Sequence, residues 1–307
     1  MKRYIFLICF SCFFISCNYY KLAYNHLSKK LKHAGLSYHT AVLQDCTIAY
    51  WDSENDKPVL ILLHGFGAST EFQWYKQANE LSKEYRVILP NLLYFGESSS
   101  QTSDFSVGSQ VKAIQKLIDK LGLSSFNLGG VSYGGLIAAE LANVEKDKIK
   151  KLMIIDAPLK FFTQEDNKAV LQNYNVANFE ELLVPSDHKK LRRLLNVAYQ
   201  HPPVAPDFGL KSFYKHAVLP HVKEQRELIK SLATQQTEYV QHDYKFDFPV
   251  LLLWGENDKL IPLHVGKELK EYFGANSELK IIPNTAHMPI LEDPKSTNKI
   301  MLDFLKK

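Results

Sequence analysis

Short, continuous runs of apolar residues recur along the chain, as expected of strands that are buried on both faces of a sheet. These runs lie at residues 58–63, 85–89, 125–129, 151–155, 249–254 and 278–282. Residues 106–121 instead place their apolar side chains on one helical face, and Gly122 is expected to end this helix. Alternating polarity at residues 37–43 and 46–52 predicts an opening hairpin. Together, these patterns predict an α/β fold with a mainly parallel sheet of about eight strands and helices on both faces.

Residues 157–244 interrupt this alternation, because they contain no clear signal for a parallel strand. Helical patterns occur within them at residues 179–183, 189–199 and 222–235, and a proline-containing link occupies residues 201–203. We therefore expect a helical lid inserted after the sixth strand, and not a separately folding domain. The α/β core is expected to comprise residues 37–156 and 245–307.

The N-terminal residues have the pattern of a targeting segment. Lys2 and Arg3 precede an apolar stretch at residues 4–15, which is shorter than the roughly 20 residues needed to span a bilayer. The stretch ends before Cys17 and resembles a bacterial lipoprotein signal, although Phe14 stands where such signals usually have leucine. This resemblance implies a signal peptide at residues 1–17, lipidation of Cys17 and attachment to the bacterial cell envelope. A plain secretory peptide, which implies a secreted or periplasmic protein, and an uncleaved anchor are the alternatives.

The connector at residues 18–36 is basic and rich in tyrosine. A helix on a membrane surface and a solvated linker are equally compatible with it. The whole chain has 307 residues, of which 46% are hydrophobic and 23% charged, and a formal net charge of +4. This composition predicts a globular chain, and no basic cluster with interleaved aromatic residues indicates a nucleic-acid partner. The oligomeric state stays open.

Candidate chemistry begins at the pentapeptide Gly130-Val131-Ser132-Tyr133-Gly134, which has the form G-x-S-x-G between a predicted strand and a predicted helix. A serine on such a tight turn has a strained backbone and an exposed hydroxyl, and the glycines avoid clashes with the neighbouring elements. Ser132 is therefore the predicted nucleophile.

A serine nucleophile needs a base to remove its proton and an acid to orient that base. His287 follows the predicted strand at residues 278–282, and Asp258 follows the strand at residues 249–254. Both loops lie at the carboxyl ends of strands, where open α/β sheets bind ligands. We assign His287 as the base and Asp258 as the acid. Asp156 is a rival acid, because it ends an earlier core strand.

Two backbone N–H groups are expected to stabilise the oxyanion of the reaction. One is that of Tyr133, directly after the nucleophile, and the other is that of Phe66, in the turn that follows the strand at residues 58–63. His64 is expected to bond the backbone of this turn, and Ser69 is expected to cap the next helix. No metal or organic cofactor is expected, since zinc-ligand spacing and a phosphate-binding glycine loop are both lacking. The four cysteines include only Cys46 beyond residue 17, so a disulfide framework is not expected.

With these motifs, the chain resembles the α/β-hydrolase superfamily over nearly all of residues 37–307. The motif set is similar to that of lid-bearing lipases and esterases of the monoacylglycerol-lipase type. Many relatives have D-x-x-G-x-G-x-S where this chain has Asn91, Tyr94, Gly96 and Ser98 at the defined positions, which puts a transferred substrate preference in doubt. Epoxide hydrolases and dehalogenases of this fold use an aspartate nucleophile, and Ser132 argues against both.

The resemblance implies a serine hydrolase that cleaves carboxylic esters, with a small acyl ester as substrate, including a monoacylglycerol. An amidase, aminopeptidase or carbon–carbon bond hydrolase on the same fold is the first alternative. A non-enzymatic ligand-binding module is the second.

Overall fold

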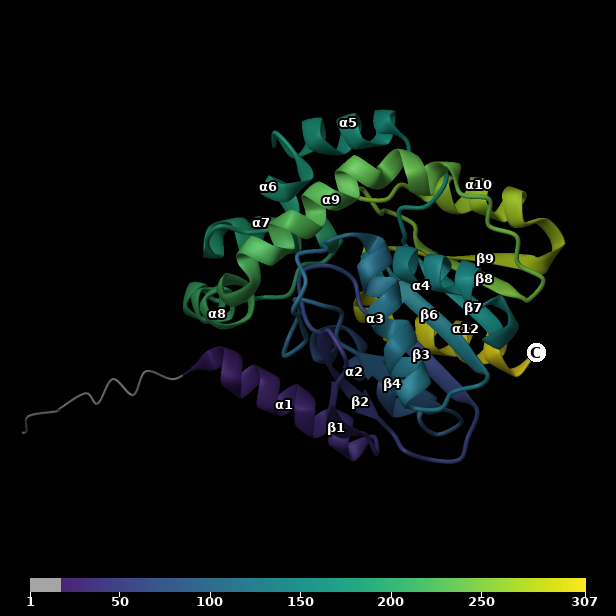
Figure 1. The fold of residues 1–307 in the computed structure, drawn as a ribbon. Helices are drawn as coiled ribbons and strands as arrows, with labels where there is room; N and C mark the ends of the chain where they lie inside the picture. Colours follow the sequence, from purple (N-terminus) through teal and green to yellow (C-terminus); the bar gives the residue numbers. More distant parts are fainter. Residues whose placement is uncertain (1–17) are drawn as a thin grey trace, which may run out of the picture.

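The computed structural model describes residues 18–307, so the predicted signal peptide and the lipidation of Cys17 lie outside the described residues. One nine-stranded sheet runs through the molecule in the order β1-β2-β4-β3-β6-β7-β8-β9, with β5 paired to β2 (Figure 1). The strands are β1 (Ser37–Val42), β2 (Cys46–Asp52), β3 (Val59–Leu63), β4 (Arg86–Pro90), β5 (Ser99–Ser100), β6 (Phe126–Val131), β7 (Ile149–Ile155), β8 (Val250–Gly255) and β9 (Ser277–Ile282).

The sheet is parallel from β4 through β3 to β9, and only the pairs that involve β2 are antiparallel. This arrangement confirms the predicted hairpin and the mainly parallel sheet. The expected count of about eight strands rises to nine because β5 has only two residues, too few for a pattern of polarity to reveal it.

Helices cover both faces of the sheet, as predicted (Figure 1). Successive residues of β3 show how: Leu60 and Leu62 belong to one buried cluster, whereas Ile61 and Leu63 belong to the other. Side chains of a strand alternate between faces, so each apolar strand supplies both layers. One layer includes α3 (Val107–Lys120), α4 (Tyr133–Val144) and α10 (Leu263–Phe273). The other includes α2 (Thr70–Leu81), α12 (Pro294–Lys306) and one side of α1 (Tyr19–His33).

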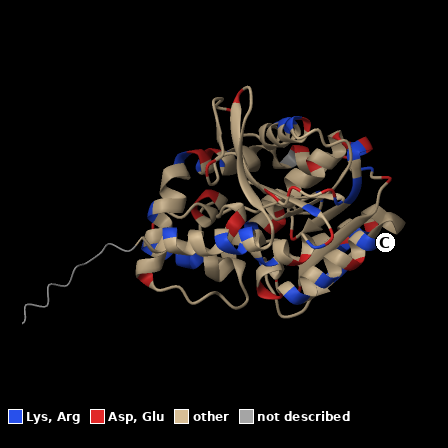
Figure 2. Cartoon of the chain, turned by 90° about the horizontal axis from the view of Figure 1, so that it is seen from below, with Lys and Arg blue, Asp and Glu red and all other residues tan. Residues whose placement is uncertain are grey.

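The predicted basic connector is largely helical, because it contains α1. Leu31 of α1 is fully buried, and Lys30 lies over the ring of Tyr75 from α2. Near the start of α1, the backbone N–H of Tyr20 donates to Ser212 Oγ of α8 at 3.0 Å. The helix therefore bridges the core and residues 157–244. Figure 2 shows basic residues along its length. Within residues 18–307, no helix is both long and apolar enough to cross a membrane.

Residues 157–244, here called the insert, join β7 to β8 and lie beyond one edge of the sheet (Figure 1). The insert contains α5 (Gln164–Asn173), α6 (Phe179–Leu183), α7 (His188–Ala198), α8 (Asp207–Phe213) and α9 (Val222–Gln241). A π-helical turn (Tyr214–Val218) and a short 3-10 turn (Leu219–His221) connect α8 to α9. Short helical segments also occur at η1 (Lys146–Lys148), η4 (Gly274–Asn276) and α11 (Pro289–Glu292).

Candidate active site

Ser132 lies on a sharp turn between β6 and α4, with φ 54° and ψ −122°. Non-glycine residues rarely adopt a positive φ, and such strain persists only where the surrounding structure imposes it. Here the Ser132 N–H donates to the carbonyl of Ile155 at 2.8 Å, which ties the turn to the end of β7. A Cβ on Gly130 would lie 2.1 Å from the Gly134 carbonyl oxygen, and one on Gly134 would lie 2.4 Å from that of Leu63. The glycines are therefore required by close backbone packing.

Asp258 and His287 are brought together from the loops after β8 and β9. His287 Nδ1 lies 2.7 Å from Asp258 Oδ2, and both side chains are almost completely buried. The other oxygen, Asp258 Oδ1, accepts from the backbone N–H groups of Leu260 and Ile261 at 2.8 and 3.0 Å. This carboxylate can only accept, so His287 Nδ1 carries the hydrogen and leaves Nε2 free to act as a base.

Ser132 and His287 line the same cavity. Within the described part of the chain, no hydrogen bond joins the Ser132 hydroxyl to the His287 ring. Such bonds are often long or poorly aligned in the absence of substrate.

The rival acid, Asp156, is also fully buried, but its neighbours differ. Its Oδ1 accepts from the backbone N–H of Gly255 at 2.9 Å. The structure thus places Asp258, and not Asp156, on the His287 ring, and joins Asp156 to the Gly255 backbone.

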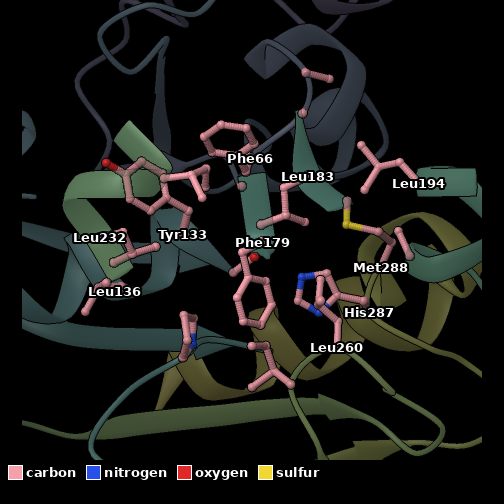
Figure 3. A pocket seen from close by; sticks show the side chains of 18 of the residues that line it. Phe66, Tyr133, Leu136, Phe179, Leu183, Leu194, Leu232, Leu260, His287 and Met288 are labelled. Carbon is pink, nitrogen blue, oxygen red and sulfur yellow. The ribbon is translucent and has the colours of Figure 1, made fainter. Parts of the chain in front are cut away.

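Phe66 and Tyr133, the two expected oxyanion donors, lie together at the cavity wall with ring centroids 6.0 Å apart (Figure 3). Tyr133 is the first residue of α4, so its N–H has no acceptor within the helix. Gln73 of α2 supports the turn that carries Phe66: its side-chain oxygen accepts from the Gly65 N–H at 2.8 Å, and its amide donates to the Gly65 carbonyl at 3.1 Å. Sequence reasoning missed Gln73, because a polar residue on a helix carries no signal of a contact with the preceding loop.

His64 contacts the backbone, as expected. Its Nε2 accepts from the Leu92 N–H at 3.0 Å, so Nδ1 is the donor to the Gly65 carbonyl at 2.8 Å. Burial lowers the pKa of His64 to about 4. This histidine is therefore neutral near pH 7 and joins the oxyanion turn to the loop after β4.

That neighbouring loop contains the departures from the family pattern. Tyr94 has φ 69°, a conformation that favours the glycine found there in many relatives. The Tyr94 carbonyl accepts from the side chain of Gln225 in α9 at 3.2 Å.

Asn91 Oδ1 accepts from the Thr70 N–H at 2.8 Å. Ser69 does occupy the N-cap position of α2, as predicted, but its side chain makes no cap bond; Asn91 reaches the first turn of that helix from another loop.

The cavity above Ser132 has a volume of about 330 Å³ and lies between the core and the insert. Leu136, Leu260 and Met288 line it from the core side (Figure 3). Phe179, Leu183 and Leu194 are among the mostly apolar side chains that the insert contributes. The arrangement places a serine on a strained turn, an imidazole held by a carboxylate, and the residues Phe66 and Tyr133 on the wall of one apolar cavity. Among residues 18–307, no group of three His, Cys, Asp or Glu side chains is placed to hold a metal ion.

Comparison with known proteins extends this description. A family model described as the alpha/beta hydrolase fold matches residues 58–294. Monoacylglycerol lipase ABHD6 of Bos taurus is 26% identical over 259 residues, which cover 81% of this chain and 75% of that protein. Epoxide hydrolase 3 of Xenopus tropicalis is 27% identical over 297 residues, which cover 91% of this chain and 77% of that protein.

A solved structure, that of a putative lipase (lip1) from Acinetobacter baumannii AYE, has a TM-score of 0.82 and 27% sequence identity. The match covers 92% of this chain and 95% of that chain. The family match spans most of the sequence, including both halves of the core. The chain belongs to the alpha/beta hydrolase fold family.

Proposed function

We propose that the protein is a carboxylester hydrolase in which Ser132, His287 and Asp258 form the catalytic triad. The family match and the similarity to lipases support a hydrolase acting on ester bonds. The observation that carries the proposal is the buried Asp258–His287 pair on the cavity that Ser132 enters from its strained turn.

In the proposed reaction, Ser132 Oγ bonds to the ester carbonyl carbon while His287 Nε2 takes the hydroxyl proton. The N–H groups of Phe66 and Tyr133 stabilise the resulting oxyanion. Collapse of this intermediate breaks the bond to the alcohol, which leaves with the proton held by His287. Water then attacks the acyl-enzyme, gives a proton to His287 and releases the acid, and the proton returns to Ser132 Oγ. Asp258 holds the imidazole in the required tautomer and stabilises its positive charge.

The apolar cavity favours the acyl chain of a lipid as the group bound there. Burial of each methylene group of such a chain stabilises the complex by about 0.8 kcal/mol. Monoacylglycerols are therefore candidate substrates, in line with the name of the bovine relative. The similarity to an epoxide hydrolase does not favour that chemistry, because such enzymes of this fold use an aspartate nucleophile and this chain has Ser132 at the turn.

We further propose that the helices α5–α9 of the insert act as a lid over this cavity. The insert supplies one wall of the cavity, so a movement of its helices would change access to Ser132. The insert contacts the core through both polar and aromatic side chains. Gln225 of α9 donates to the loop after β4, and Phe72 of α2 packs edge-on against Phe213, with ring centroids 5.1 Å apart.

A membrane surface in the cell envelope is the proposed location. The support comes from the lipoprotein-like sequence that ends at Cys17 and from α1, where Lys21, Lys29, Lys30 and Lys32 are all exposed. Basic residues near an anionic bilayer add about 1 kcal/mol each to its attraction. Helix α1 also packs against the insert, which would place the lid near the surface that supplies lipid substrates.

The test of the function is turnover of a panel of p-nitrophenyl and monoacylglycerol esters of varied chain length, with an amide and a diketone included. Turnover of esters is expected to exceed that of the other two, and Ser132→Ala is expected to lower kcat by on the order of 10⁴-fold or more. Ser186→Ala, at an exposed position in the insert, is the matched control. Ester turnover that survives in Ser132→Ala would place the nucleophile elsewhere.

A further inference from the structure

Asp156 occupies an unusual position directly after β7. Its side chain is fully buried, and its backbone has φ 44°. The backbone N–H of Asp156 donates to the Leu253 carbonyl at 3.1 Å, and Oδ1 accepts from the Gly255 N–H at 2.9 Å. Both contacts tie Asp156 to the end of β8, three residues before Asp258.

The second oxygen, Asp156 Oδ2, is buried and has no donor partner among the described residues. Asp258 is the neighbouring side chain that can form a hydrogen bond with Asp156. Both residues contact Gly255: Asp156 Oδ1 accepts from its N–H, and the backbone N–H of Asp258 donates to its carbonyl at 3.3 Å. Two carboxylates cannot donate to each other. A buried oxygen without a partner is costly, and two like charges side by side add to that cost.

A proton on Asp156 removes both costs. The repulsion between two carboxylates disappears, and the O–H of the neutral acid can donate a hydrogen bond to Asp258. Asp258 has room for this bond. A carboxylate offers about four acceptor positions, and three are used by Leu260 N–H, Ile261 N–H and His287 Nδ1–H.

We propose that Asp156 is a neutral carboxylic acid whose Oδ2–H donates to the Asp258 carboxylate, and that it is a positioning residue that sets the basicity of the Asp258–His287 pair. This inference rests on the proposed function of that pair.

The surroundings of Asp156 favour its neutral form. Burial, followed by the charge of Asp258, raises the pKa of Asp156 well above its usual value, against a smaller opposing effect of the Gly255 N–H bond. Glu292, the next charged group that acts on it, is also acidic. His287 contacts Asp258 Oδ2, and Tyr174 of the insert is a further titratable group that interacts with Asp258.

The proposed bond has a consequence for catalysis. A donor on Asp258 spreads part of the carboxylate charge, so the imidazolium form of His287 receives less stabilisation. Loss of the donor is therefore expected to favour the imidazolium form and to make the free base scarcer at a given pH. The acid limb of the pH profile of kcat/KM reports the protonation of the essential base in the free enzyme.

Two substitutions separate the hydrogen bond from the charge. Asp156→Asn keeps one acceptor for the Gly255 N–H and one donor for Asp258, as the neutral acid does. Asp156→Leu has a similar size but neither group. The pH profile of kcat/KM for a p-nitrophenyl ester is measured for both variants and for the full-length wild type.

We expect the acid limb of Asp156→Asn to match that of wild type, and the limb of Asp156→Leu to move upward by about 0.5 to 1 pH unit. A downward shift in Asp156→Asn would overturn the proposal, because it would mean that the substitution removed a negative charge. An unmoved limb in Asp156→Leu would show that no such hydrogen bond tunes the pair.

A second measurement covers the case in which Asp156→Leu does not fold. The infrared carbonyl band of a protonated carboxylic acid is expected in wild type near neutral pH and is expected to disappear in Asp156→Asn. Absence of this band from wild type would refute the proposal. The infrared result does not depend on turnover, so a failure of the proposed function, seen as lack of ester hydrolysis, remains distinguishable from a failure of this inference.

Discussion

Replacing Ser132 with glycine is expected to make the protein more stable than replacing it with alanine, although both changes remove the proposed nucleophile. The reason is the backbone of Ser132, with φ 54° and ψ −122°. Alanine must adopt this conformation with the same steric strain as serine, whereas glycine adopts positive φ without it. The pair of variants therefore isolates the strain of the turn from the loss of the hydroxyl.

The magnitude follows from two opposing contributions. A non-glycine residue in such a sparsely populated conformation costs about 1–3 kcal/mol. Glycine loses more conformational freedom on folding, which costs about 0.5–1 kcal/mol relative to alanine. The difference favours Ser132→Gly by about 1 kcal/mol at the middle of these ranges and by at most about 2.5 kcal/mol. In a chain of this size, 1 kcal/mol shifts the unfolding midpoint by about 2 °C, so the expected gap is about 2 °C and at most about 5 °C.

The assay is thermal unfolding of Ser132→Gly and Ser132→Ala at the same scan rate, followed by circular dichroism. Ser186 provides the control, because it lies in an exposed bend of the insert and does not have a positive φ. There, the glycine variant is expected to unfold at the same temperature as the alanine variant or below it. If Ser132→Gly were also the less stable of its pair, the turn would store no strain and the argument for an imposed nucleophile geometry would fail.

Three further changes, one of them with a control variant, test other parts of the site and the chain. Asp258→Asn is expected to lower kcat/KM for a p-nitrophenyl ester by about 10³- to 10⁴-fold, because the imidazole loses its orienting charge; a loss below tenfold would contradict its role. Gly134→Ala is expected to cost about 3 kcal/mol or more in urea unfolding, since the new Cβ would lie 2.4 Å from the Leu63 carbonyl oxygen. Gly108→Ala, where the nearest atom is 3.5 Å away, is expected to leave stability unchanged or to raise it. Wild type is expected to incorporate labelled palmitate and Cys17→Ser is not; an unlabelled wild type would rule out the lipoprotein interpretation.

Structural features that depend mainly on residues close in the sequence could be predicted from the sequence alone. The apolar runs predicted the strands that form the core, because a parallel strand buried on both faces needs apolar side chains at every position. The G-x-S-x-G turn was equally readable, because its glycines are dictated by atoms within a few residues or on the adjacent strand. The order of strands and helices then confirmed the predicted fold class.

Helices that are stabilised by contacts with distant residues could not be predicted from the sequence. Helices α5 and α8 were missed: α5 has a mostly polar sequence and begins at a capping box of Thr163 and Asp166, while α8 has seven residues and packs against α1 and α7. Short helices are stabilised mainly by packing and caps, so a weak periodic pattern does not reveal them.

The candidate site, too, was predicted only in part from the sequence. The sequence alone determined that Ser132, two carboxylates and His287 follow strands at one edge of the sheet. It left Asp156 and Asp258 as rivals, because both stand at the end of a core strand. Only the tertiary structure decided that Asp258 contacts the imidazole and that the buried Asp156 instead accepts from the Gly255 N–H, since the distance between side chains from separate loops depends on how the strands pair and twist.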